Sequence, residues 1–208
     1  MSDQLTPQTS RPRRRALREV VQTLLLAVGM YVAVQFFVLP YEVDGASMDP
    51  RLHNGDRLLV NRNAYVHFNA NDLWNLIPGV EREGDAKIYP FHAPERGDVI
   101  VFDPPQASDK PYIKRVIGLP GERVTFRNGY VFVDGEQLDE SYIDGPITRC
   151  SRGSENCNLG PIPDGHVFVL GDNREHSQDS RAFGLVAVDQ IIGQAFFVNW
   201  PLDDLGPL

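Results

Sequence analysis

Residues 112–135 read YIKRVIGLPGERVTFRNGYVFVDG, three apolar stretches separated by short turn signals. Val, Ile, Tyr, Phe and Thr dominate these stretches, as is typical of β-strands. Asn128-Gly129 and Asp134-Gly135 are strong hairpin signals, because both central residues of a type I′ turn need a positive φ angle. The stretch therefore predicts consecutive antiparallel strands joined by tight turns.

Similar short runs occur on both sides of this stretch, bounded by the Gly, Pro, Asn and Asp residues that end strands and form turns. We therefore expect an all-β fold, an antiparallel β-sheet domain over residues 40–208 with a hairpin-rich insertion at about 128–163. The expected strands are residues 57–61, 98–102, 112–119, 123–127, 130–133, 166–170 and 191–199.

Residues 63–95 carry little strand signal and form an expected excursion from the sheet. Their apolar side chains fit either a protein core or a bilayer surface, where Trp and Tyr are favoured, and the sequence does not decide between the two. These side chains are Trp74, Leu76, Ile77, Tyr89 and Phe91.

A different pattern occupies the first forty residues. An uncharged run at residues 20–39 follows five arginines, Arg11, Arg13, Arg14, Arg15 and Arg18. Twenty helical residues span roughly 30 Å, the thickness of the hydrocarbon core of a bilayer. The run is longer than the apolar part of a cleavable signal and lacks the polar stripe of a core helix. We therefore expect one transmembrane helix at residues 20–39.

The charges around this helix indicate its orientation, because basic flanks stay on the cytoplasmic side. Residues 1–19 are expected to be cytoplasmic and residues 40–208 extracytoplasmic, in a single-pass protein of the cell membrane. The chain has a net charge of −8, of which residues 1–19 contribute +3 and residues 20–39 nothing, so the exported part carries −11. This argues against nucleic acid as a partner, since phosphate binding needs clustered Lys and Arg.

The chain has two cysteines, Cys150 and Cys157, in a stretch rich in Gly, Ser and Asn. In an oxidising compartment such a pair can close a small loop as a disulfide, and two free thiols are equally compatible with the sequence. No further ligands with metal-binding spacing accompany them. We therefore expect neither a metal nor another cofactor.

Three segments are denser in small and polar residues than a sheet edge requires: residues 45–50, 112–121 and 171–181. Taken alone, Ser47 in the first segment is a turn residue. The third segment is either a charged turn that satisfies its own hydrogen bonds or a surround that fixes catalytic groups. The residues alone leave both alternatives open.

Lys114, in the second segment, lies between apolar neighbours. Strand alternation places it beside Tyr112 and Val116, with Ile113 and Ile117 on the opposite side. If that face is covered, desolvation lowers the pKa of the amine from its reference of about 10.4. A neutral amine is then available as a general base near neutral pH.

Five motifs together resemble the ordered boxes of the type I signal peptidases, also called leader peptidases. They are Ser47-Met48 with Pro50, Gly55-Asp56, Arg96-Gly97-Asp98-Val99, residues 112–121 and residues 171–181. The resemblance covers most of residues 40–199, with the helix in front. It implies a membrane-bound serine endopeptidase that removes signal peptides from exported preproteins by cleaving after a small-x-small site, usually Ala-x-Ala.

Carried over position by position, the resemblance implies that Ser47 is the nucleophile and Lys114 the general base of a Ser/Lys dyad. Ser177 would hydrogen-bond the lysine amine and orient it. Three further residues of the last motif would hold that region in shape: Asp172, Asp179 and Arg181.

The resemblance also implies an oxyanion site and substrate pockets. The Ser47 N–H would be the first oxyanion donor. Some family members carry a serine two residues before the nucleophile as the second donor, and here that position is Gly45, whose backbone is the remaining candidate. Shallow pockets for small substrate side chains would be lined by Tyr41, Val43, Tyr112 and Ile113.

Glu175 and His176 depart from the Asp and Asn that the family often has. His176 invites a Ser/His/Asp hydrolase with Asp172 or Asp179 behind it, but that reading gives the apolar setting of Lys114 no use. A non-catalytic membrane-tethered β-domain that binds exported chains is a second alternative. A self-cleaving Ser/Lys protease related to transcriptional repressors is a third, disfavoured by the anchor and by the lack of a DNA-binding module. The expected partners are exported preproteins and membrane lipid.

Overall fold

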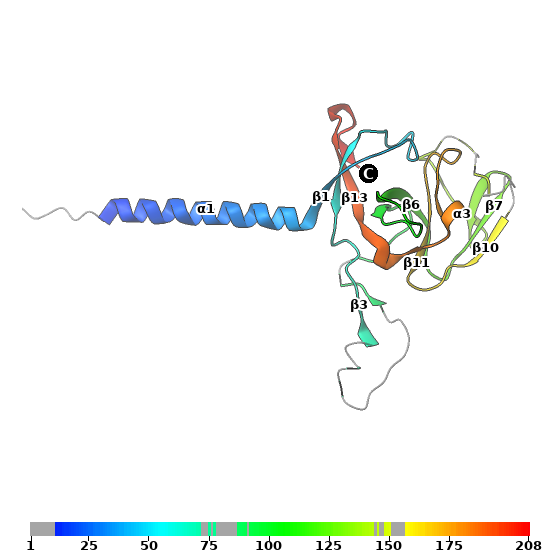
Figure 1. The fold of residues 1–208 in the computed structure, drawn as a ribbon, viewed down its shortest axis with the longest axis horizontal. Coiled ribbons are helices and arrows are strands. Elements are labelled where there is room, and N and C mark those ends of the chain that lie inside the picture. Colours follow the sequence, from blue (N-terminus) through cyan, green and yellow to red (C-terminus); the bar gives the residue numbers. More distant parts are fainter. Residues whose placement is uncertain are drawn as a thin grey trace, which may run out of the picture. The chain divides into compact units, whose positions relative to one another are not determined.

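The computed structural model describes residues 11–71, 75, 77, 87–90, 92–143, 145, 148–150 and 157–208. The chain divides into two compact units, Met1–Phe37 and Val38–Leu208, and each is described by itself (Figure 1). The first unit contains one helix, and the second contains all the strands of the described residues.

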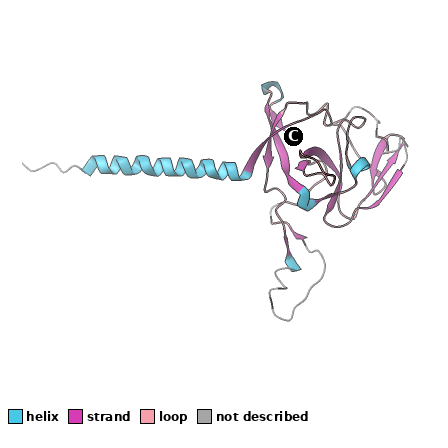
Figure 2. Ribbon diagram, viewed as in Figure 1, coloured by secondary structure: helices cyan, strands magenta, loops and turns pink. Residues whose placement is uncertain are grey.

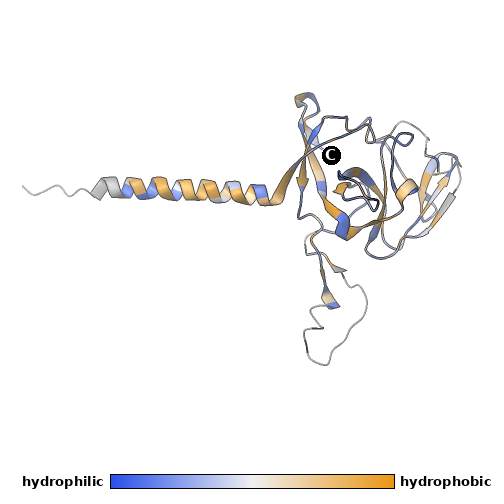
Figure 3. Ribbon diagram, in the orientation of Figure 1, coloured by the Kyte–Doolittle hydropathy of each residue, from blue (hydrophilic) through white to orange (hydrophobic). Residues whose placement is uncertain are grey.

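Helix α1 spans Arg11–Phe37. Its described side chains are exposed on all sides, and Figure 3 shows apolar residues along most of its length. Residues 15–37 are long and apolar enough to cross a membrane. The expected end at residue 39 is two residues too late, because Val38 and Leu39 already pair with the next strand. Apolar residues suit both a membrane helix and a strand, so hydropathy alone does not place this boundary.

The main sheet of the second unit has eight antiparallel strands in the order β1-β2-β13-β5-β6-β11-β12, with β14 beside β13. This confirms the predicted antiparallel all-β fold. The strands are β1 (Val38–Glu42), β2 (Arg57–Asn61), β5 (Val99–Phe102), β6 (Tyr112–Gly118), β11 (His166–Leu170), β12 (Val186–Ala187), β13 (Ile191–Trp200) and β14 (Gly206–Pro207).

The edge strand β1 approaches the beginning of β6, although three strands separate the two in the sheet order. The Tyr41 hydroxyl donates a hydrogen bond of 3.0 Å to the Pro111 carbonyl. Asp44, just beyond β1, pairs with Lys110. Residues that follow β1 and begin β6 also share one buried apolar cluster. The sheet therefore curls back on itself and brings two distant segments of the chain together.

A second sheet, in the order β10-β7-β8-β9, forms most of the insertion (Figure 2). The turn residues Asn128 and Asp134 have φ angles of 53° and 49°, and the glycines after them have 84° and 90°, as expected for type I′ turns. The insertion starts earlier than the expected residue 128, because β7 already pairs within this sheet. The strands are β7 (Arg123–Arg127), β8 (Tyr130–Val133), β9 (Glu136–Gln137) and β10 (Cys157–Pro161).

Strand β10 has no counterpart among the expected strands. Its sequence CNLGP contains Asn, Gly and Pro, which are depleted in strands, so propensity does not reveal it. Pairing with β7 overrides this local preference. Before β10, Cys150 is disulfide-bonded, and Cys157 is the other cysteine of the chain.

Two short strands, β3 (Phe68–Asn69) and β4 (Lys87–Ile88), pair within residues 63–95. In this excursion Tyr89 packs against a buried cluster, whereas Ile77 is exposed. Outside the described residues lie Trp74, Leu76 and Phe91. The remaining short elements are α3 (Ser180–Phe183), η1 (Val188–Gln190) and η2 (Leu202–Asp204).

Strand β6 is buried on both faces. Val116 belongs to one apolar cluster, whereas Ile113 and Ile117 belong to two others. Strand alternation places Lys114 on the same face as Val116, and the structure buries every residue of β6 except Tyr112, which is half-buried. Lys114 therefore lies inside the domain and not at a solvated edge.

Gly193 is required where β13 passes β2. A Cβ at this position would stand 2.4 Å from the Asn61 carbonyl oxygen, a backbone atom that cannot move away easily. We expect Gly193→Ala to lower the free energy of unfolding by about 1–3 kcal/mol, as overpacking usually does. Urea unfolding of the full chain in detergent micelles measures the change.

Gly206→Ala in β14 is the matched control, because no atom lies within 4 Å of its added Cβ. This variant should be as stable as the original protein or slightly more stable, since alanine restricts the unfolded chain. Equal stabilities of the two variants would contradict the close approach of β13 and β2.

Candidate active site

Ser47 lies in the loop between β1 and β2. Gly45, two residues earlier, has a φ angle of 101°, which favours glycine. Met48 and Leu52 are fully buried, and the Leu52 N–H donates to the Met48 carbonyl at 2.9 Å. Because these two residues anchor the loop in the core, Ser47 is held half-buried at its surface.

The Lys114 side chain reaches this loop from β6. Its Nζ lies 2.7 Å from Ser47 Oγ and 2.7 Å from the carbonyl oxygen of Ile113. Lys114 is only 4% exposed. The structure thus brings together two of the expected residues that are separated by 66 others in the sequence.

Burial of the amine lowers the pKa of Lys114 from 10.5 to about 8, while the negative charges of Asp179 and Asp172 raise it and limit the shift. Desolvation dominates because the ammonium loses its hydration shell within the domain. A neutral amine can accept the Ser47 proton, whereas the ammonium can only donate to the hydroxyl. The geometry and the pKa together fit a general base paired with a nucleophile.

The segment after β11 packs directly on the nucleophile loop. A Cβ at Gly171 would stand 2.4 Å from the Ser47 carbonyl oxygen and 2.2 Å from Ser177 Oγ, so only glycine fits there. The Asn173 N–H donates to the Ser47 carbonyl at 3.1 Å. Residues 171–181 therefore contact the nucleophile loop through their backbone.

Two buried carboxylates hold this segment in place. Asp172 accepts two hydrogen bonds from Arg115, of 2.9 and 2.6 Å, in a bidentate ion pair. Asp179 accepts from the Gly171 N–H at 3.1 Å and from the Arg181 guanidinium at 2.8 Å. Asp172 therefore binds an arginine, and Asp179 binds both an arginine and the backbone, which fits the expected supporting role.

Ser177 does not make the expected hydrogen bond to Lys114. Its Oγ is buried and has no partner among the described residues. The lysine amine is instead directed to Ser47 and to the Ile113 carbonyl. This carbonyl comes from the residue just before the lysine, so a local acceptor takes the place that the expectation gave to Ser177.

The Gly45 backbone is also not free as the second oxyanion donor, because its N–H donates to Asn54 Oδ1 at 2.7 Å. In contrast, no group in the described part of the chain accepts a hydrogen bond from the Ser47 N–H. The first expected donor is therefore available, and the second is engaged in holding the loop.

His176 is exposed, and its ring makes no hydrogen bond to Ser47. Its Nδ1 is 3.2 Å from Asn173 Oδ1, and its N–H points to the same oxygen. The hydroxyl of Ser47 is bonded to Lys114 instead. The described residues thus give the Ser/His/Asp alternative no geometry.

The four expected pocket residues differ in exposure: Val43 and Ile113 are buried, and Tyr41 and Tyr112 are half-buried. Tyr41 and Val43 line a cavity of about 450 Å³ beside Lys110. Ile113 is buried in the same apolar cluster as Val43. The Tyr112 ring lies 5.5 Å from Lys114 Nζ.

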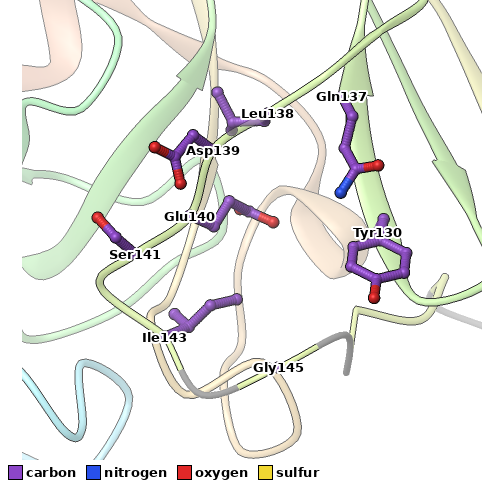
Figure 4. A pocket seen from close by; sticks show the side chains of 8 residues that line it. All are labelled: Tyr130, Gln137, Leu138, Asp139, Glu140, Ser141, Ile143 and Gly145. Atoms are coloured by element: carbon purple, nitrogen blue, oxygen red, sulfur yellow. The ribbon is translucent and has the colours of Figure 1, made fainter.

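A separate cavity of about 400 Å³ lies in the insertion (Figure 4). It is lined by residues including Tyr130, Gln137 and Glu140, and neither Ser47 nor Lys114 reaches it. Among the described residues one group could hold a metal ion, and it also lies outside the dyad: His53, Asp56 and Asp204.

Sequence reasoning missed the links between the catalytic segment and the insertion. Arg174 is buried and donates to the Gly171 carbonyl at 3.0 Å, to Thr148 and to Glu140. The Arg115 guanidinium lies 4.2 Å from the centre of the Tyr142 ring. Arg115 stands in an apolar motif, which signals a buried acidic partner because an unpaired buried charge is too costly, whereas Arg174 stands among polar residues and gives no such signal. The sequence alone does not say which acid that partner is.

The sequence matches the family described as signal peptidase, peptidase S26, over residues 17–200. Signal peptidase IB of Staphylococcus aureus is 34% identical over 204 residues, covering 92% of this chain and 93% of its own length. The probable signal peptidase I-1 of Synechocystis sp. is 34% identical over 200 residues, covering 92% of this chain and 87% of its own length.

A solved structure is also similar. The crystal structure of a signal peptidase I from Enterococcus faecalis aligns with a TM-score of 0.43 and 32% identity. The alignment covers 49% of this chain and 95% of that chain.

The buried Asp172–Arg115 pair should contribute strongly to stability. We expect Asp172→Ala to lower the free energy of unfolding by about 3–5 kcal/mol, because it leaves the Arg115 charge buried without a partner. Asp44→Ala is the control: its pair with Lys110 is solvent-exposed, so stability should change little. Denaturant unfolding of both full-length variants provides the comparison, and similar small losses would argue against a supporting role for Asp172.

Proposed function

Because this chain belongs to the signal peptidase family, peptidase S26, we propose that Ser47 and Lys114 form the catalytic dyad with which it removes signal peptides. The chain is a serine endopeptidase that acts on exported preproteins. The observation that carries the proposal is the 2.7 Å contact between a buried amine and a half-buried hydroxyl. Burial lowers the pKa of Lys114 so that it can act as the base, and the loop anchored by Met48 and Leu52 holds the Ser47 hydroxyl beside it.

The reaction is an acyl transfer. Neutral Lys114 takes the Ser47 proton as Oγ adds to the scissile carbonyl, and the resulting oxyanion is stabilised by the Ser47 N–H. When the tetrahedral intermediate collapses, the C–N bond breaks and the lysine ammonium protonates the leaving amine. A water molecule, deprotonated by the same amine, then adds to the acyl-enzyme, and collapse releases the signal peptide as a carboxylate and returns the proton to Ser47.

Two open backbone edges near the dyad suit an extended substrate. Val43 bonds to one neighbour only, since its N–H donates to Asp56 and its carbonyl accepts from Gly55. By alternation, Glu42 and Asp44 point their backbone groups away from β2. Extended peptides commonly add to such an edge.

The second edge is the beginning of β6. Strand β11 pairs with β6 at Arg115, Val116 and Gly118, so residues 112–114 have no strand on that side within the described chain. We place the extended substrate segment along these edges, near Val43 and Ile113, which brings its scissile carbonyl to Ser47.

We expect cleavage after a small-x-small, Ala-x-Ala-like sequence, and the apolar residues of this region support that expectation. Tyr41, Val43, Tyr112 and Ile113 would form shallow pockets that accept small side chains. A side chain too large for such a pocket is disfavoured by roughly 1–3 kcal/mol per ill-fitting group. Ser177, with its buried hydroxyl, remains our candidate for orienting the amine once substrate is bound.

We also propose that α1 anchors the enzyme as a single membrane span, with residues 1–19 cytoplasmic and the domain from residue 40 outside the cytoplasm. The exposed apolar surface of α1 supports lipid as its environment, and the arginines before it support the orientation. The acidic charge of the exported part supports exported chains, and not nucleic acid, as partners. An anchor keeps the active site near the membrane, where the apolar segment of a preprotein ends.

A non-catalytic domain that only binds exported chains would leave Lys114 exposed, with an ordinary pKa. Lys114 is instead buried beside Ser47. Burial of a lysine costs stability, and a binding surface has no use for it.

Ser47→Ala and Lys114→Met should each abolish cleavage of a preprotein by the purified full-length protein. Methionine has a similar length and removes the buried ammonium, so Lys114→Met should unfold at a temperature no lower than the original protein. Ser141→Ala, at an exposed serine of the insertion, should cleave at the original rate. Normal cleavage by either dyad variant would disprove the assignment.

Activity should rise with pH through the pKa of Lys114. Below about pH 8 the amine is protonated and cannot accept the Ser47 proton, so kcat/KM should fall about tenfold for each further pH unit. The profile of kcat/KM against pH for a peptide with an Ala-x-Ala site should therefore show one ascending limb with a midpoint near 8. A midpoint near 10.5, the ordinary value for lysine, would show that burial does not tune the base.

A further inference from the structure

Asn173 contacts both peptide groups that flank the nucleophile. Its side-chain Nδ2 donates to the Ala46 carbonyl at 3.0 Å, and its backbone N–H donates to the Ser47 carbonyl at 3.1 Å. The first carbonyl belongs to the peptide before Ser47, and the second to the peptide after it. One residue of the last motif, residues 171–181, thus fixes the backbone on each side of Ser47.

The first of these contacts bears directly on the oxyanion site. The Ala46 carbonyl and the Ser47 N–H are parts of the same planar, trans peptide group, so they point in opposite directions. Fixing the carbonyl therefore fixes the direction of the N–H. We propose that the Asn173 side chain is a positioning residue that aims the Ser47 N–H at the oxyanion of the transition state, an inference that rests on the proposed dyad.

The orientation of the Asn173 amide is fixed by the chemistry of its neighbours. The Ala46 carbonyl is only an acceptor, so it must face the NH₂ group. The His176 N–H is only a donor, and it lies 3.3 Å from Oδ1. The His176 ring Nδ1 lies 3.2 Å from the same oxygen and donates to it in the tautomer that carries the hydrogen on Nδ1. A flipped amide would place Oδ1 against the Ala46 carbonyl oxygen and the NH₂ group against the His176 N–H.

Asn173 also polarises the donor that it aims. The Ala46 carbonyl accepts from Asn173 Nδ2 and from the Asp49 N–H, the latter at 3.3 Å. Donation to a peptide carbonyl strengthens the hydrogen bond that the N–H of the same peptide can give, because such chains are cooperative. Because the Gly45 N–H already donates to Asn54, the Ser47 N–H is the main donor that this loop can offer to the oxyanion. An oxyanion develops only in the transition state, so the effect should appear in kcat.

Asn173→Ala tests the inference, because it removes the side-chain donor and keeps the backbone N–H. We expect kcat for an Ala-x-Ala peptide to fall about ten- to hundredfold, less than the loss of a whole oxyanion donor. KM should change less than about twofold, because ground-state binding does not use this hydrogen bond. The ascending limb of the pH profile should stay in place, since Lys114 keeps its contacts.

A peptide aldehyde gives a second readout. The Ser47 Oγ adds to its carbonyl to form a hemiacetal, whose oxygen occupies the oxyanion site. Its affinity should fall by the same factor as kcat/KM in Asn173→Ala. Affinity for a peptide with a reduced, non-cleavable amide should stay unchanged. A merely structural role for Asn173 would weaken both ligands equally, and that result would overturn the inference.

Asn173→Asp keeps the size of the side chain but places a carboxylate oxygen against the Ala46 carbonyl, so it should lose at least as much kcat as the alanine variant. Glu175→Ala, at an exposed residue of the same segment, is the control and should keep kcat. Retention of kcat within about twofold in Asn173→Ala would overturn the inference. Unfolding of both Asn173 variants would do so too, because it would assign the residue to the fold. Full activity of Ser47→Ala or Lys114→Met would instead refute the dyad itself, which separates the two failures.

Discussion

Desolvation of one amine is the constraint on which the rest of the structure depends. Lys114 can act as a base near neutral pH only if its surroundings deprive the ammonium of water without destroying the fold. A buried strand in a curled sheet meets this condition, because both faces of β6 are covered. The Ile113 carbonyl and the Ser47 hydroxyl then give the amine its only two recorded hydrogen-bond partners in the described chain.

The two carboxylates near the Lys114 amine are both paired with arginines. Asp172 and Asp179 lie near enough to raise the pKa of Lys114, which works against a neutral base. Each is paired with an arginine, Arg115 or Arg181, through charge-assisted hydrogen bonds. These ion pairs hold residues 171–181 in place, and burial remains the dominant influence on the pKa of Lys114.

Much of the fold could be predicted, because hairpin turns and strand runs are local signals. Asn128-Gly129 and Asp134-Gly135 marked two turns, and the Lys114 contact with Ser47 followed from ordered motifs. Strand β10 could not be found, because its pairing with β7 overrides an unfavourable composition. Neither Ser177 nor Gly45 bonds as expected, since each depends on competition with a neighbour, the Ile113 carbonyl in one case and the Asn54 amide in the other.

The arginine contacts of the insertion have a consequence for its evolution. Arg174 ties Glu140 and Thr148 to the Gly171 carbonyl, while Tyr142 covers the guanidinium of Arg115. A hairpin-rich appendage of this kind would otherwise be a module free to be lengthened, trimmed or exchanged between relatives. Here the inner residues of the insertion contact Arg174 and Arg115, which pack beside the candidate active site. We therefore expect substitutions to be tolerated more easily in the outer loops of the insertion, whereas a change at an inner contact needs a matching change in residues 171–181 or in β6.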